Sequence, residues 1–111
     1  MEVEIREVVF SKVAHENLEE LYVYGMETFS YSSATDFLDE LYAEILKLSS
    51  SHLHHPECRY LKTTSKKYRN LRFKNHLVIY RVSKTRIEVL TIIHSSRSVS
   101  KIKTARQIKI P

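Results

Sequence analysis

Glycine, proline and cysteine are nearly absent from this sequence. Its 111 residues include one glycine, two prolines and one cysteine, Cys58. The scarcity of glycine and proline argues against flexible linkers and glycine-rich phosphate-binding loops. A single cysteine excludes an internal disulfide, which suits a reducing compartment. The length predicts a single domain over residues 1–111.

Long hydrophobic runs are absent as well. No stretch approaches the roughly 20 apolar residues that a membrane-spanning helix needs. The first residues, Met-Glu-Val-Glu-Ile, lack the basic start and apolar block of a signal peptide. These two absences predict a cytoplasmic protein that has no membrane partner.

Acidic residues are almost missing from the second half of the chain. Residues 1–58 carry three Lys or Arg and 12 Asp or Glu, a net charge of −9. Residues 59–111 carry 15 Lys or Arg and a single acid, Glu88, a net charge of +14. Such asymmetry predicts a basic surface for an anionic partner. The alternative is a basic face that only keeps a sheet soluble.

Three strand-like runs follow one another in this basic half. They are rich in β-branched and aromatic residues and cover Tyr68–Lys74, Leu77–Val82 and Ile87–His94. The turns between them are short and polar, which favours antiparallel pairing of neighbours. The pattern predicts a three-stranded antiparallel meander.

A strand and two helices are expected before the meander. Alternation of apolar and charged residues predicts a strand at Glu2–Phe10. Ser11 can cap a helix whose apolar stripe runs to Phe29, and Ser33 can cap a second helix with a stripe that ends at Leu48. The expected fold is α+β: an N-terminal strand, a two-helix hairpin and the antiparallel meander in one sheet, with the helices packed on one face.

Some residues on these stripes carry further expectations. Gly25 lets a neighbouring element approach the first helix closely. Seven tyrosines raise the possibility of base stacking. Tyr22 and Tyr42 lie on the helix stripes, where a place in the core is the better prediction. Tyr68 and Tyr80 are open between the two roles.

Two segments lack a regular pattern. Residues 49–56 are expected to form a loop whose histidines, His52, His54 and His55, are solvated, because metal sites need ligands at a defined spacing. We expect no metal and no cofactor. At the other end of the chain Ile108 and Ile110 alternate with polar residues, and this tail is expected to fray unless a partner orders it.

Three motifs resemble the RelE/ParE toxin superfamily. His55–Arg59 is similar to its Pro-x-x-Gly/Cys-Arg link, Leu77–Val82 to its Ile-x-Tyr-Arg-Val strand, and Ile87–Arg97 to its Ile-x-Ile-Leu-x-Val-x-His-x-x-Arg ending. The order of the expected elements is similar too. The resemblance implies the toxin of a type II toxin–antitoxin pair, often called a plasmid stabilisation protein. It also implies a cognate antitoxin, acidic or helix-rich, that neutralises it.

The superfamily implies two activities. RelE-like members are ribosome-dependent mRNA endonucleases, whereas ParE-like members inhibit DNA gyrase by binding it. Leu77 stands where RelE-like nucleases commonly carry a basic residue, and the terminal tyrosine of several nucleases is missing. The resemblance therefore favours a ParE-like gyrase inhibitor, although Ser98 stands where such chains commonly have Asp. An mRNA endonuclease and a non-toxic basic nucleic-acid-binding module are the alternatives.

The candidate catalytic residues follow from the chemistry of RNA cleavage. Such a reaction needs a base, an acid and cations around the phosphorane, which His94 and Arg97, with Arg81 or Arg69, could supply. Each residue has another possible role. His94 could be a hydrogen-bonding plug at the end of its strand, and Arg97 could form a salt bridge with the acidic half. Arg81 could face outward or pair with a helix carboxylate such as Glu40 or Glu44.

A toxin that acts by binding needs exposed contact residues instead of a catalytic set. Basic residues that alternate with apolar ones along a strand are expected on the open face of the sheet. The residues expected to meet the target or partner are Arg97, Arg69, Arg72, Lys74 and Lys101.

Overall fold

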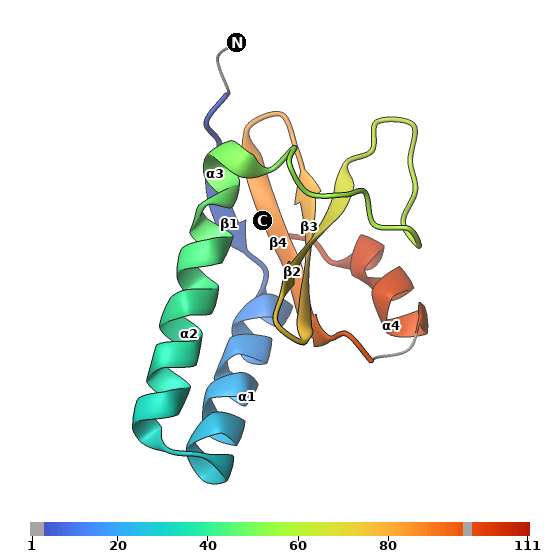
Figure 1. Cartoon of the computed structure of the whole chain (residues 1–111). Helices are drawn as coiled ribbons and strands as arrows, with labels where there is room; N and C mark the ends of the chain where they lie inside the picture. The colour runs from blue at the N-terminus through green and yellow to red at the C-terminus, as the bar shows by residue number, and fades with distance from the viewer. Residues whose placement is uncertain (1–3, 97–98) are drawn as a thin grey trace.

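The computed structural model describes residues 4–96 and 99–111, which form an α+β fold (Figure 1). Its elements are β1 (Glu7–Phe10), α1 (Lys12–Thr28), α2 (Tyr31–Leu46), α3 (Leu48–Ser51), β2 (Tyr68–Phe73), β3 (His76–Val82), β4 (Arg86–His94), α4 (Val99–Thr104) and the 3-10 turn η1 (Ala105–Gln107). Within these described ranges, no helix has the length and apolar character needed to cross a membrane.

The strands form one mixed sheet in the order β1-β4-β3-β2. β2, β3 and β4 pair antiparallel in chain order, which confirms the predicted meander. β1 lies parallel to β4, with Glu7 beside Arg86 and Phe10 beside Val89. The expectation of a purely antiparallel sheet was therefore wrong in one pairing. The two long helices and two strands between β1 and β4 form the long connection that parallel neighbours require. The first strand is Glu7–Phe10, and residues 4–6 of the predicted strand are not part of it, whereas Glu2 and Val3 lie outside the described residues.

α1 and α2 cover one face of the sheet and form the larger core with it. Ser11 caps α1 as predicted, since its Oγ accepts a hydrogen bond from the Ala14 N–H at 2.9 Å. Leu41 and Ile45 of α2 are fully buried against the sheet residues Val78 and Tyr80. The two apolar stripes were thus predicted on the correct face of each helix where the sheet lies beneath them.

The far end of the hairpin extends past the sheet (Figure 1). Phe29 is 72% exposed and Tyr24 60% exposed there, because no strand lies beneath them. Tyr42, expected in the core, is 46% exposed and stacks on Phe10 with a ring distance of 5.4 Å. The cap of α2 was also misplaced. Ser30 is the N-cap, and its Oγ accepts a hydrogen bond from the Ser33 N–H at 3.0 Å.

The close approach expected at Gly25 is present. A Cβ atom built on Gly25 would lie 3.0 Å from the Cβ of Ala34, which is tighter than normal packing of side chains. The missing side chain therefore lets α2 lie directly against α1 near the end of the hairpin.

The opposite face of the sheet carries a second core. The residues buried in it are Cys58, Leu61, Tyr68, Ile79, Leu90, Ile102 and Ala105. Ile108 and Ile110 of the tail pack against this cluster. Two expectations are therefore corrected: helical segments cover both faces of the sheet, and the tail is docked rather than frayed. Its alternating apolar residues find a complementary apolar face within the same chain.

The histidine-rich segment is more ordered than expected. Leu48–Ser51 forms the short helix α3, although a loop was predicted from residue 49. His52 is 1% exposed and its Nδ1 lies 3.0 Å from the carbonyl oxygen of Leu48. His54 is exposed and His55 half-buried. The expectation of solvated histidines is therefore wrong for His52, which follows a helix that packs on the sheet.

Candidate functional site

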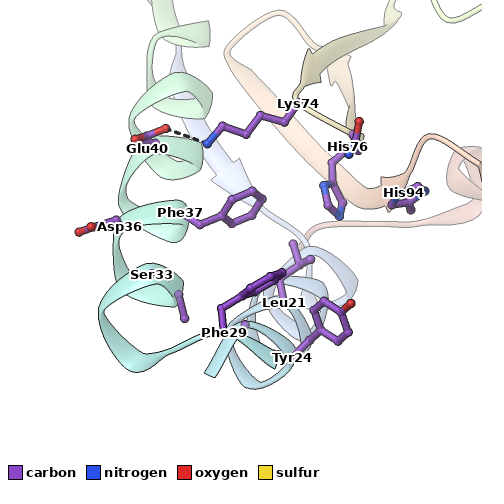
Figure 2. A pocket seen from close by; sticks show the side chains of 13 residues that line it. Leu21, Tyr24, Phe29, Ser33, Asp36, Phe37, Glu40, Lys74, His76 and His94 are labelled. Carbon is purple, nitrogen blue, oxygen red and sulfur yellow. Dashed lines mark ion pairs between the residues drawn. The ribbon is translucent and has the colours of Figure 1, made fainter. Parts of the chain in front are cut away.

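A groove of about 590 Å³ lies between the helical hairpin and the turn that joins β2 to β3 (Figure 2). The hairpin contributes mostly apolar surface, and the turn contributes polar side chains. Its lining residues include Leu21, Tyr24, Phe29, Ala34, Phe37, Glu40, Lys74, His76 and His94. The groove exists because the helix stripes continue past the sheet, which leaves apolar side chains without a covering layer.

Two histidines lie at the strand side of this groove. His76 is the partner of His94 in the antiparallel pairing of β3 and β4, and their ring centroids are 5.3 Å apart. His76 is half-buried, its Nδ1 has no hydrogen-bond partner among the described residues, and burial, followed by the proximity of His94, lowers its pKa. His94 is exposed and its Nδ1 accepts a hydrogen bond from the Ser96 N–H at 3.1 Å. One role expected for His94 was a hydrogen-bonding plug at the end of its strand. Its imidazole does form a hydrogen bond there, but it lies on the surface.

Lys74, the one lysine or arginine among the described residues that line the groove, is already paired. Lys74 lies in the β2–β3 turn with a left-handed φ of 52°. Its Nζ is 3.2 Å from a carboxylate oxygen of Glu40 and lies over the ring of Phe37 at 5.4 Å (Figure 2). Asp36 lines the same groove. The helix side of the groove therefore carries two carboxylates and offers little attraction to a phosphate group.

Arg81 is engaged in a different network from the one expected. Its Nε donates to Glu88 Oε1 at 2.6 Å, and Arg86 lies 2.7 Å from the other carboxylate oxygen. The expected pairing with Glu40 or Glu44 is wrong, because Glu88 lies directly opposite Arg81 in the β3–β4 pairing. Burial acts to raise the pKa of Glu88, but the hydrogen bonds from Arg81 and Arg86 outweigh it and hold the pKa below 4.5.

This network also fixes the end of the chain. Arg86 Nη2 donates to the carbonyl oxygen of Ile110 at 2.6 Å, and Arg81 Nη2 donates to that of Ile108 at 3.3 Å. Sequence reasoning missed this arrangement. The available signal was Glu88 itself, the one acid among 15 Lys and Arg residues in the second half.

His94 and Arg81 lie at opposite ends of the sheet. His94 pairs with His76, whereas Arg81 pairs with Glu88, six residues earlier along β4. At about 3.3 Å per residue, this places the two positions roughly 20 Å apart. The structure therefore does not assemble these two members of the candidate nuclease set. Arg97, the third, lies outside the described residues.

The other predicted contact residues have different surroundings. Arg72 and Lys101 are exposed, on β2 and α4 respectively. Arg69 was expected on the open surface, but it is half-buried and its Nη1 donates to the carbonyl oxygen of His55 at 2.8 Å. Arg69 therefore helps to hold the segment before β2 against the sheet.

Tyr80 and Tyr68, left open by the sequence, are both buried. The Tyr80 hydroxyl donates to the carbonyl oxygen of His52 at 2.6 Å, and burial raises the pKa of Tyr80. Tyr68 lies beneath the cationic groups of Lys67 and Arg81, at 5.6 and 5.9 Å from its ring centroid. Neither ring is available to stack on a base. Within residues 4–96 and 99–111, no group of three or more His, Cys, Asp or Glu side chains could hold a metal ion.

Comparison with known proteins gives the family. The family model of the ParE toxin of the type II toxin–antitoxin system, parDE, matches residues 8–99. No curated protein is significantly similar to this chain in sequence.

Solved structures show the same fold. A chain from the chromosomal ParDE toxin–antitoxin system of P. aeruginosa has a TM-score of 0.69 and 14% identity, and the match covers 82% of this chain and 97% of that one. A chain from the RelBE2 toxin–antitoxin complex of Mycobacterium tuberculosis has a TM-score of 0.55 and 19% identity, with 81% and 98% covered. Because the family model spans most of the sequence, the chain belongs to the ParE toxin family of type II toxin–antitoxin systems.

Proposed function

We propose that this toxin acts in the cytoplasm by binding and inhibiting DNA gyrase, and that it is not a nuclease. The observation that carries the proposal is the position of Arg81 and His94 at opposite ends of β3 and β4. A nuclease needs its acid, base and cations around one phosphate group, within hydrogen-bond reach. A toxin that acts by binding has no such requirement.

The pairing of two cations, one at the groove and one at the other end of the sheet, supports the same conclusion. Lys74 is paired with Glu40, and Arg81 is shared between Glu88 and the tail, so neither of these cations is free to stabilise a phosphorane. Leu77 places an apolar side chain on β3 at the position where the related nucleases commonly carry a basic one. Loss of one such electrostatic group typically costs about 100- to 1000-fold in rate.

The groove is the proposed binding site of the cognate antitoxin. Phe29 and Tyr24 are exposed beside it, and contiguous apolar surface of this kind is typical of protein interfaces. An amphipathic segment with apolar side chains directed at Phe37 and Leu21 would cover this surface. The similarity to chains from two toxin–antitoxin complexes supports an antitoxin partner.

A titration of purified toxin into a gyrase supercoiling reaction tests the proposed activity. We expect dose-dependent inhibition, and we expect Arg97→Ala to weaken it without lowering the melting temperature. Lys84→Ala, which removes an exposed cation from the β3–β4 turn, is the matched control and should inhibit like the wild type. Unimpaired supercoiling at a large excess of folded toxin would contradict the proposal.

A ribosome-dependent mRNA endonuclease is the second candidate. The observation that favours it is the His76–His94 pair, because two imidazoles 5.3 Å apart could act as base and acid. The lowered pKa of His76 would keep one ring neutral near pH 7. This candidate still needs a cation near the pair, and Lys74, the one lysine or arginine among the described lining residues of the groove, is bound to Glu40.

A further inference from the structure

Eight exposed basic side chains lie on two segments at the face of the sheet that α1 and α2 do not cover. One segment is the loop of residues 59–67 that precedes β2, and the other comprises α4, η1 and the start of the tail. We call these side chains the C-terminal basic surface. They are Arg59, Lys62, Lys66, Lys67, Lys101, Lys103, Arg106 and Lys109.

The two segments have a common support. Leu61 of the loop and Ile102 and Ala105 of α4 and η1 are buried in the same apolar cluster. Figure 1 shows the loop and α4 on the same side of the sheet, away from the hairpin. The cations therefore project from packed segments, so that little further order is required when a partner binds.

No acid of the basic half neutralises this surface. Glu88, the only acid among residues 59–111, is 6% exposed and is bound by Arg81 and Arg86. Among the described residues, none of the eight cations forms an ion pair, whereas Lys47 and Lys74 on other parts of the molecule do. Glu57 of the acidic half is half-buried and accepts a hydrogen bond from the Thr63 N–H of the loop at 3.2 Å, so one partly buried acid lies beside the eight cations. A predominantly basic surface of this kind attracts polyanions and releases their counterions on binding.

The aromatic residues indicate which polyanion fits. The exposed aromatic side chains among the described residues, Tyr24, Phe29, Tyr31 and Tyr42, all lie on the hairpin. Single-stranded nucleic acids are usually bound on aromatic platforms where bases stack, and the C-terminal basic surface has none. Its nearest ring, Tyr60, is half-buried with the guanidinium of Arg59 at 5.1 Å. The chemistry suits a stacked duplex that is contacted through its phosphates.

We propose that the C-terminal basic surface binds the phosphate backbone of duplex DNA. The choice of DNA over duplex RNA rests on the proposed function, in which the toxin meets a DNA-bound enzyme. The groove lies at the hairpin side, so a segment that fills the groove leaves this surface open. The toxin would thus hold DNA and its protein partner on different faces.

Fluorescence anisotropy with a labelled 20-base-pair duplex tests the proposal on the purified full chain. The affinity should fall as salt rises, with a log–log slope of about −0.9 per phosphate neutralised. If half of the cations contact phosphates, raising salt from 50 to 200 mM weakens binding roughly 100-fold. Duplex RNA and single-stranded DNA of the same sequence should bind more weakly than duplex DNA.

Two triple variants with equal net charge separate a defined surface from total charge. The surface variant loses three cations of the C-terminal basic surface through Lys101→Gln, Lys103→Gln and Arg106→Gln. The control variant loses three exposed cations elsewhere through Lys12→Gln, Lys47→Gln and Lys84→Gln. The surface variant should bind DNA at least about tenfold more weakly, with a slope shallower by about 2 to 3. The control variant should stay within about twofold of the wild type. Thermal melts that match the wild type confirm that both variants are folded.

Several outcomes would overturn the proposal. They are an equal loss of DNA affinity in the two variants, no binding of duplex DNA at 50 mM salt, and tighter binding of duplex RNA or single-stranded DNA than of duplex DNA. The proposal would also fail if the protein showed no affinity for DNA but self-associated at low salt, and if the surface variant abolished this self-association. The partner of the surface would then be the acidic hairpin of a second copy. If the protein binds duplex DNA but does not inhibit gyrase, the proposed DNA-binding surface stands and the proposed function fails.

Discussion

Glu88 on β4 and Arg81 on β3 face each other across the sheet, with Oε1 and Nε 2.6 Å apart. Arg86 binds the second oxygen of the same carboxylate. Because both guanidinium groups also donate to carbonyl oxygens of the tail, this one carboxylate orients the two side chains that hold the chain terminus on the sheet. Glu88 therefore links the sheet to the tail that packs on the second core.

Replacement of Glu88 by Gln should destabilise the protein by about 2 to 4 kcal/mol, because two partly buried guanidinium groups would lose their counter-charge. Urea unfolding measures the change. Glu27→Gln, an exposed carboxylate on α1, is the control and should change the free energy of unfolding by less than about 0.5 kcal/mol. Equal, small effects of the two substitutions would mean that the network adds nothing to stability.

Acid should weaken the same network. The pKa of Glu88 is lowered in the folded state, so the folded protein binds this proton less readily than the unfolded chain does. The stabilisation is present above 4.5, the usual pKa of the side chain, and is lost as the pH falls through the lowered folded-state value. Melting temperatures between pH 6 and pH 3 should fall more steeply for the wild type than for Glu88→Gln. Parallel curves would contradict this assignment.

His76 predicts a second pH effect at milder acidity. Burial, and then the neighbouring His94, hold its folded-state pKa below the usual 6.5. The unfolded chain therefore takes up the proton first, and stability should decline as the pH drops from about 6.5 towards the lowered value. His76→Gln should reduce the loss of melting temperature between pH 7.5 and pH 5. The exposed Thr64→Gln, which replaces no titratable group, is the control and should leave it unchanged. An equal reduction in both variants would count against the role of His76.

The core of α2 gives a prediction about packing. Leu41 is fully buried against the sheet, so Leu41→Ala should cost roughly 2 to 5 kcal/mol. Lys47 is exposed and forms an exposed ion pair with Glu44 at 2.8 Å, so Lys47→Ala should cost less than about 1 kcal/mol. Thermal melts at one pH compare the two variants. Similar small losses would show that this helix face is not the one that holds the fold.

The sequence predicted the three C-terminal strands to within two residues, because alternation and turn chemistry are local properties. It did not predict that β1 lies parallel to β4, since that pairing depends on the path of the whole connection. The apolar stripes were treated as core along their full length. The end of the first stripe, at Phe29, lies beyond the sheet, and a pattern on one helix carries no information about how far its covering layer extends.

The candidate site was predicted less completely than the fold. His94 and Lys74 were predicted in separate candidate sets, yet both line one groove. Arg81 was assigned to the wrong carboxylate. The partner of a strand residue is set by register, and the bulge between Ile79 and Tyr80 shifts that register within β3 and β4. The groove forms where Phe37 of α2 and the β2–β3 turn lie close together. These segments are far apart in the sequence, so a pattern within either one does not predict the groove.

The most direct test of the account is a paired assay at one toxin concentration. Translation on programmed ribosomes, followed by primer extension, detects cuts in the message, and a parallel reaction measures supercoiling by gyrase. Wild-type protein and His94→Ala are compared in both. We expect intact message with inhibited gyrase, and no effect of His94→Ala on either reading. Codon-dependent cuts that disappear in His94→Ala, with gyrase unaffected, would contradict it.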